Sequence, residues 1–165
     1  MDRLFSPWRS RYIASFIHAT NDEACVFCTA HAERRDDEHF VVYRGETCFI
    51  VMNLYPYNSG HVMIVPNRHI GTFTDLTPEE SSEVMRLTAR TITALQSVIR
   101  PDGFNFGSNL GKTAGAGIDK HIHFHLVPRW NGDTNFMPVL ADTKMISEDM
   151  ADQLKRLRSA LTAVK

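Results

Sequence analysis

The most constraining feature of this sequence is the run from His121 to Val127, in which histidines alternate with apolar residues as His-Ile-His-Phe-His-Leu-Val. Side chains of a β-strand point alternately to its two faces, so this run predicts a strand over residues 121–127. Ile122, Phe124 and Leu126 would then face a hydrophobic core, and the three histidines would share the opposite face. A half-buried strand does not need such a row of imidazoles, so the pattern indicates a functional site.

Further strands are expected on both sides of a single long helix. Turn residues and apolar runs predict strands at 39–43 and 47–52, joined around Gly45, and further strands at 61–65 and 104–108. Thr77-Pro78-Glu79-Glu80 is typical of a helix start, because it combines a capping residue, an early proline and a glutamate three positions after the cap. Apolar residues then recur at helical spacing until Arg100-Pro101-Asp102-Gly103 ends the helix.

A second helix is expected from about Ser147, where Met150, Leu154, Leu157 and Leu161 form a narrow apolar stripe. The fold class predicted from these elements is α+β, with an antiparallel sheet of about five strands, one long helix and a C-terminal helix.

The length and charge of the chain limit what kind of protein it can be. The 165 residues suffice for one domain. The formal net charge of -1 argues against a nucleic-acid-binding surface. Because no signal-peptide core or membrane-spanning stretch is found, we expect a cytoplasmic protein without a membrane partner.

The three histidines allow two kinds of site. A metal ion could be bound, but histidines two positions apart on a strand are separated by roughly 7 Å and the outer pair by about 14 Å. One ion cannot reach all three, and at least one further ligand would have to come from elsewhere. Alternatively, a neutral imidazole could attack a phosphoryl group and form a covalent phosphoramidate. The flanking histidines would then neutralise charge on the phosphate oxygens.

A glycine-rich loop, residues 111–117, precedes the histidines. Its glycines would let backbone N–H groups approach an anion closely, which makes Gly115, Ala116 and Gly117 candidate substrate contacts. A P-loop is excluded, because Phe106 stands where that motif requires its first glycine and no helix follows. The alternative is a flexible connection between two strands.

Cys25-Val26-Phe27-Cys28 contains a closely spaced cysteine pair. Together with His69 and His121 it would make a tetrahedral zinc set that fastens the N-terminal segment to the sheet. The alternative is a pair of free or redox-active cysteines, although no βαβ pattern supports a thioredoxin-like role. The third cysteine, Cys48, is expected to be a buried strand residue.

Residues His121 to Val127 match the signature of the histidine-triad family, in which three histidines alternate with apolar residues. The resemblance extends over about residues 23–130 and includes Asn53, Gly60-His61-Val62, Pro66 with His69-Ile70, and Ala114-Gly115. Trp8-Arg9 and the run 128–136 resemble the bacterial diadenosine tetraphosphate phosphorylase-like branch, which is related to the fragile-histidine-triad hydrolases. The expected division is an N-terminal arm (1–22), a histidine-triad domain (23–130) and a C-terminal extension (131–165) packed on that domain.

The resemblance implies a role for each matching residue. His123 would be the nucleophile, His125 and His61 would contact the phosphate or bridging oxygen, and Asn53 would bind the ribose hydroxyls. Asn109 stands where the fragile-triad hydrolases carry a glutamine, and its shorter amide favours the phosphorylase branch. In zinc-bearing relatives the ligands correspond to Cys25, Cys28, His69 and His121, which implies structural zinc. The family fold agrees with the elements predicted above, and members are usually homodimers that share a sheet.

The sequence therefore predicts an enzyme that cleaves dinucleoside polyphosphates, such as diadenosine tetraphosphate, through a covalent nucleotidyl-His123 intermediate. Water as the second acceptor would make it a hydrolase, and inorganic phosphate would make it a phosphorylase. One alternative is a nucleotide-binding or sensing module without significant turnover, because a fold does not by itself establish activity. Another is a zinc hydrolase that activates water.

Overall fold

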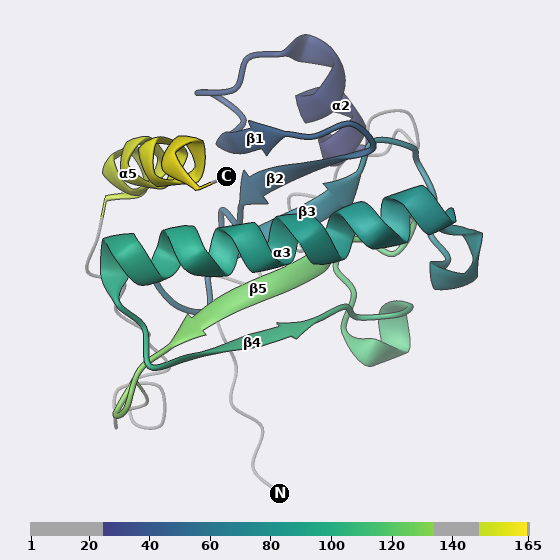
Figure 1. Ribbon diagram of the computed structural model, residues 1–165. Coiled ribbons are helices and arrows are strands. Elements are labelled where there is room, and N and C mark those ends of the chain that lie inside the picture. Colours follow the sequence, from purple (N-terminus) through teal and green to yellow (C-terminus); the bar gives the residue numbers. More distant parts are fainter. Residues whose placement is uncertain (1–24, 134–148, 165) are drawn as a thin grey trace, which may run out of the picture.

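The computed structural model describes residues 25–133 and 149–164, which contain a five-stranded antiparallel sheet in the order β1-β2-β3-β5-β4 (Figure 1). The strands are β1 (Val41–Arg44), β2 (Cys48–Met52), β3 (Val62–Pro66), β4 (Gly103–Gly107) and β5 (Phe124–Arg129). The predicted α+β class and the five-stranded antiparallel sheet are confirmed. The arm predicted for residues 1–22 and the expected helix start near Ser147 lie outside the described residues.

Three α-helices lie in the described part of the chain: α2 (Val26–Glu33), α3 (Pro78–Ile99) and α5 (Met150–Ala163). Short 3-10 turns occur at Phe73–Asp75 and Lys112–Ala114. Helix α3 crosses one face of the sheet with α5 beside it, whereas α2 lies on the other side, near β1 and β2 (Figure 1). A search of the described helices for one that could span a membrane found none.

The start of α3 forms as the sequence predicts. The Thr77 hydroxyl accepts a hydrogen bond from the Glu80 amide at 3.2 Å, and the Glu80 carboxylate accepts one from the Thr77 amide at 2.9 Å. This reciprocal capping satisfies two amides that the first helical turn would otherwise leave without partners. At the other end Arg100 adopts a left-handed conformation with φ 46°, and Pro101 follows.

Glu83 connects α3 to the hairpin of β1 and β2. Its carboxylate is buried and accepts hydrogen bonds from the amides of Glu46, Thr47 and Cys48 and from the Thr47 hydroxyl. Arg86 pairs with the same carboxylate from the solvent side. The turn between the two strands is therefore held by one buried anion from the helix.

Helix α2 is not predicted by the sequence pattern. Cys25 caps its first turn without a side-chain hydrogen bond, and only Phe27 and Ala30 of the helix are buried. Neither a capping side chain nor an apolar stripe marks the helix in the sequence, and packing on the sheet stabilises it instead. The helix matters for the site because it carries Cys28.

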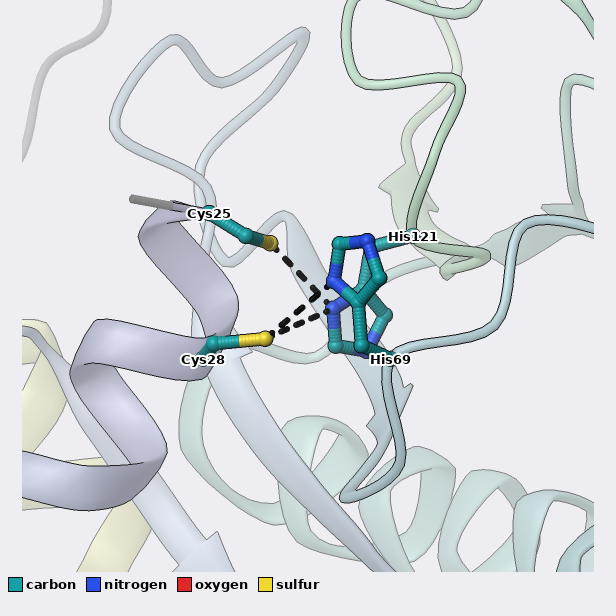
Figure 2. A group of neighbouring side chains, drawn as sticks. All are labelled: Cys25, Cys28, His69 and His121. Atoms are coloured by element: carbon teal, nitrogen blue, oxygen red, sulfur yellow. Dashed lines mark hydrogen bonds between the residues drawn. The ribbon is translucent and has the colours of Figure 1, made fainter. Parts of the chain in front are cut away.

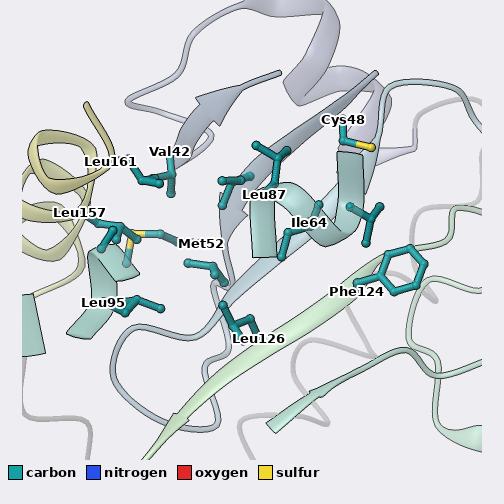
Figure 3. Close-up of a cluster of buried hydrophobic side chains, with 14 of the residues drawn as sticks. Val42, Cys48, Met52, Ile64, Leu87, Leu95, Phe124, Leu126, Leu157 and Leu161 are labelled. Carbon is teal, nitrogen blue, oxygen red and sulfur yellow. The ribbon is translucent and has the colours of Figure 1, made fainter. Parts of the chain in front are cut away.

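The sheet separates two hydrophobic clusters. The larger lies between the sheet, α3 and α5, and it includes Phe124 and Leu126 together with Leu157 and Leu161 of the predicted C-terminal stripe (Figure 3). Ile122 and Leu154 belong to the same cluster. Cys48 belongs to this cluster and is fully buried, as expected. The smaller cluster lies between α2 and the opposite face of β1, β2 and β3, and it includes Phe27, Val51 and Met63. His125 is the register partner of Met63, so this histidine lies on the α2 face of the sheet.

The prediction of a strand beginning at His121 is wrong, because β5 begins at Phe124. The residues before it bond to the last residue of β3 and to the loop that follows β3. The Ile122 amide donates to the Ile70 carbonyl at 2.6 Å, and the His121 ring bonds the Pro66 carbonyl at 2.9 Å. Ile122 and Phe124 still pack in the core beside the sheet, although His121 and His123 are buried as well. The bonds to Pro66 and Ile70 bring His121 close to His69.

Candidate active site and metal centre

Four sulfur- and nitrogen-bearing side chains converge where the start of α2 meets the loops beside β3 and β5 (Figure 2). The Cys25 sulfur lies 3.3 Å from the His121 Nδ1 atom, and the Cys28 sulfur lies 3.2 Å from the Nδ1 atom of His69 and 3.6 Å from that of His121. All four ligand atoms lie within 4.8 Å of one another. The structure thus brings together all four residues that the sequence predicted as metal ligands.

The spacing and protonation of this cluster fit a tetrahedral metal centre. Zn–S and Zn–N bonds of ordinary length place sulfur and nitrogen about 3.6 Å apart at the corners of a tetrahedron, close to the separations found here. The His121 Nε2–H donates to the Pro66 carbonyl at 2.9 Å, which leaves the Nδ1 lone pair facing the sulfurs. Burial lowers the pKa of His121 to about 4, so its ring is neutral and able to bind a cation.

The thiols need a cation more than the imidazoles do. Burial and the neighbouring Cys25 thiol raise the pKa of Cys28 to about 11, which disfavours a thiolate in the absence of positive charge. A bound cation would favour the thiolate and release its proton. The cluster is therefore suited to hold a metal ion.

His123 is oriented by the backbone of His121. Its Nδ1–H donates to the His121 carbonyl at 2.9 Å, so that Nε2 carries the lone pair. The His123 side chain is buried, and the loss of hydration lowers its pKa, which keeps the imidazole neutral. The Phe27 ring lies 5.1 Å from the His123 ring and restricts its position. This arrangement is that of a preorganised nitrogen nucleophile.

His61 and His125 are hydrogen-bonded to each other, and the hydrogen-bond partner of each ring shows which of its nitrogens carries the proton. The Tyr57 amide donates to His61 Nδ1 at 3.1 Å, so His61 carries its proton on Nε2. That proton is donated to His125 Nδ1 at 3.0 Å, and the proton of His125 therefore resides on Nε2. Burial, reinforced by His125 and His123, lowers the pKa of His61 to about 3 and keeps it neutral. The result is a directed donor chain from Tyr57 to His125.

The rings of His123 and His125 lie close together, with centroids 5.0 Å apart. The Nε2 lone pair of His123 and the Nε2–H donor of His125 can thus contact the same small group. A phosphoryl group matches this combination, because it offers an electrophilic phosphorus atom and acceptor oxygens.

Asn53 lies beside His61. Its side-chain oxygen accepts from the Tyr55 amide at 2.9 Å, and its side-chain nitrogen lies 3.3 Å from His61 Nδ1. Asn109 is farther along the chain and contacts the glycine loop, where its side-chain nitrogen lies 3.4 Å from the Gly115 carbonyl.

The glycine loop is more ordered internally than its composition suggests. The amides of Ala114, Gly115 and Ala116 donate to the carbonyls of Gly111 and Lys112 within the loop. Gly115 has a φ of +94°, a left-handed conformation that favours glycine. A bound anion would therefore compete with these internal bonds for two of the three predicted contacts, Gly115 and Ala116.

Two features of the site are absent from the sequence prediction. One is the Tyr57 amide, which fixes the tautomer of His61 through the backbone and so leaves no signal in residue type. The other is an open pocket of about 430 Å³ beside His125, lined by Tyr57, Asn58, Asn105, Phe106, Gly107, Ser108, Asn109, His125, Val127 and Arg129. The alternation of Asn105 and Gly107 along β4 could have indicated a face shared with His125, had the strand pairing been known.

Comparison with known proteins identifies the family. The family model described as HIT domain matches residues 34–132. This chain belongs to the HIT domain family, and the resemblance to the histidine-triad proteins is confirmed.

Among curated proteins, the AP-4-A phosphorylase of Mycobacterium tuberculosis is 40% identical over 162 residues, which cover 95% of this chain and 83% of that protein. An adenosine 5'-monophosphoramidase of Saccharomyces cerevisiae is 29% identical over 111 residues, covering 67% of this chain and 66% of that protein. Among solved structures, a Zn-bound histidine triad family protein from Mycobacterium smegmatis aligns with a TM-score of 0.70 and 27% identity, covering 87% of this chain and 96% of that chain.

Proposed function

We propose that this chain is an enzyme that cleaves dinucleoside polyphosphates, with diadenosine tetraphosphate as the representative substrate, through a nucleotidyl group carried on His123. The observation that carries the proposal is the hydrogen bond from His123 Nδ1–H to the His121 carbonyl at 2.9 Å, which leaves Nε2 as a nucleophile. The relative named AP-4-A phosphorylase supports the substrate class.

In the first step His123 Nε2 attacks the α-phosphorus of the substrate. An N–P bond forms while the bond from phosphorus to the bridging oxygen breaks, and that oxygen leaves with the electron pair. The His125 Nε2–H donates a hydrogen bond to that oxygen and stabilises its negative charge, and His61 Nε2–H holds His125 in the required tautomer. With diadenosine tetraphosphate the leaving group is ATP, and AMP remains on His123.

In the second step an acceptor attacks the same phosphorus atom and releases His123. Water gives AMP and inorganic phosphate gives ADP. Asn53 would hold the ribose, while Asn109 and the amides of Gly115, Ala116 and Gly117 would contact phosphate oxygens. We favour phosphate as the acceptor, because the shorter amide of Asn109 and the phosphorylase relative both support it.

Cys25, Cys28, His69 and His121 would hold a structural zinc ion, and the Zn-bound relative from Mycobacterium smegmatis supports this choice of metal. Zinc would supply a rigid cross-link between α2 and the segment that carries His123. Four protein ligands complete a tetrahedral site and leave no position for an activated water. The proposal therefore assigns zinc no part in the chemistry and disfavours a water-activating zinc hydrolase.

A homodimer that shares a continuous sheet is also part of the proposal. In the described sheet β1 and β4 are the edge strands, and Arg158 of α5 already bonds the Val41 carbonyl of β1. That leaves β4 as the edge better suited to pair with a second copy. The domain division at residues 22 and 130, a cytoplasmic location and the absence of nucleic-acid binding also remain proposals.

The test is to incubate the protein with diadenosine tetraphosphate, with and without inorganic phosphate, and to identify the products. ADP that forms only with phosphate supports phosphorolysis, and AMP in either buffer supports hydrolysis. Tight nucleotide binding without turnover of any dinucleotide would contradict the enzymatic proposal and favour a sensing module.

A further inference from the structure

Among the described residues that line the pocket beside His125, only His125 and Asn109 contact the substrate in the proposed function. The pocket lies on the face of the sheet where β5 and β4 pair, with Gly107 opposite His125, and Asn105 opposite Val127. These four residues form its floor. His125 lines the pocket, whereas His123 does not. The pocket therefore extends from His125 along β5, away from the nucleophile.

The direction of the pocket matches the direction in which a leaving group departs. In phosphoryl transfer the attacking and leaving atoms lie roughly in line on opposite sides of phosphorus. His123 would attack the phosphorus atom from one side, and the bridging oxygen on the other side would accept a hydrogen bond from His125. The rest of the substrate would then lie over Val127. We propose that this pocket is the subsite for the leaving nucleotide, an inference that rests on the proposed function.

The walls suit a sugar-phosphate group. Tyr57 is 39% exposed, and its ring centroid lies 6.0 Å from that of His125, so this aromatic side chain can pack against a ribose or base. Arg129 is the only lysine or arginine among the described lining residues, and its Nη1 donates to the Asn105 side-chain oxygen at 2.7 Å. Asp133 anchors the same guanidinium. The pocket thus presents a fixed guanidinium, whose charge is balanced by Asp133, and side-chain amides as hydrogen-bond donors to a polyphosphate.

The size of the pocket supports one nucleotide and not two. A volume of about 430 Å³ lies in the lower part of the range found for small-molecule sites. The nucleotidyl group that is transferred to His123 would occupy the Asn53 side of the site. The two halves of a dinucleotide would thus lie on opposite sides of His125.

Gly107 offers a selective way to fill this pocket. A Cβ atom built on Gly107 meets no atom within 4 Å, and its φ does not lie in the left-handed region. Gly107→Leu should therefore fold while its side chain occupies the pocket floor. Gly103 is the matched control, because it lies on the same strand, also meets nothing within 4 Å, and does not line the pocket.

The experiment compares two substrates that both deliver AMP to His123. Diadenosine tetraphosphate releases ATP, whereas adenosine 5'-phosphoramidate releases only ammonia and needs no leaving-nucleotide subsite. For Gly107→Leu we expect kcat/KM to fall at least about tenfold with the dinucleotide and less than about threefold with the phosphoramidate. Gly103→Leu should change either value by less than about threefold.

Equal losses with both substrates would overturn the subsite, because Gly107 would then act through His125. Unchanged cleavage of the dinucleotide would overturn it as well. A fall in melting temperature confined to Gly107→Leu would show that the chain itself fills the pocket, and would also refute the inference. Failure of the wild-type protein to cleave any dinucleotide would instead refute the proposed function.

Discussion

Replacement of His61 should change how the stability of the protein depends on pH. Burial holds the pKa of His61 near 3, whereas the unfolded chain returns it to its ordinary value of about 6.5. The unfolded state therefore binds a proton more readily as the pH falls. Above pH 6.5 His61 is neutral in both states and hardly changes the free energy of unfolding. As the pH falls from 6.5 towards 3, only the unfolded state binds the proton, so the free energy of unfolding decreases progressively.

The size of this effect follows from the two pKa values. Each pKa unit corresponds to about 1.4 kcal/mol, so protonation of unfolded His61 should cost about 2.5 kcal/mol between pH 7 and pH 4.5. In the variant His61→Gln the side chain does not titrate but can still accept from the Tyr57 amide. We expect the free energy of unfolding of the wild type to fall by about 2 to 3 kcal/mol more than that of the variant over this range.

The assay is urea unfolding at several pH values, followed by circular dichroism, with both proteins treated identically. Titration of His121 occurs in both proteins and largely cancels in the comparison. If the two curves of stability against pH stay parallel within about 0.5 kcal/mol, burial does not hold His61 neutral, and the donor chain loses its basis.

Three further predictions follow from individual contacts. Cys28→Ser should lower the zinc content measured by elemental analysis and the melting temperature, whereas Cys48→Ser should retain the zinc, because Cys48 lies outside the metal cluster; equal zinc in both variants would exclude the proposed ligands. Glu83→Ala should lower the free energy of unfolding by at least about 3 kcal/mol in urea, because it leaves buried amide donors without an acceptor. The matched control is Glu79→Ala on the exposed side of the same helix, which should cost far less stability, and similar losses in the two variants would contradict this account. Chelation should lower the melting temperature while the fraction that stays folded keeps its activity, and complete loss of activity in folded, metal-free protein would contradict a purely structural metal.

Much of the site could be predicted from the sequence, because its chemistry depends on residue types at short spacings. The alternation around His123 identifies both the core face and the imidazole face. The cysteine pair Cys25 and Cys28, taken together with His69 and His121, suggests a metal site. The capping residues of α3 act locally, and for that reason the sequence places the start of this helix correctly.

The features that the sequence misses depend on contacts between distant segments. Helix α2 forms because Phe27 and Ala30 pack on the sheet, and its sequence carries no capping signal. The strand at the triad begins at Phe124 because Ile122 bonds to Ile70 instead. The pocket beside His125 requires the pairing of β4 with β5, which no local pattern specifies.

The central claim is that His123 carries the nucleotidyl group, and trapping that adduct tests it most directly. The protein is mixed with diadenosine tetraphosphate labelled at the α-phosphorus, quenched in alkali within one turnover, and digested for peptide mapping. The account predicts label on the peptide that contains His123, stable to alkali and released by acid, and neither label nor turnover in His123→Ala. Turnover that persists in His123→Ala, or label on another residue, would contradict the account.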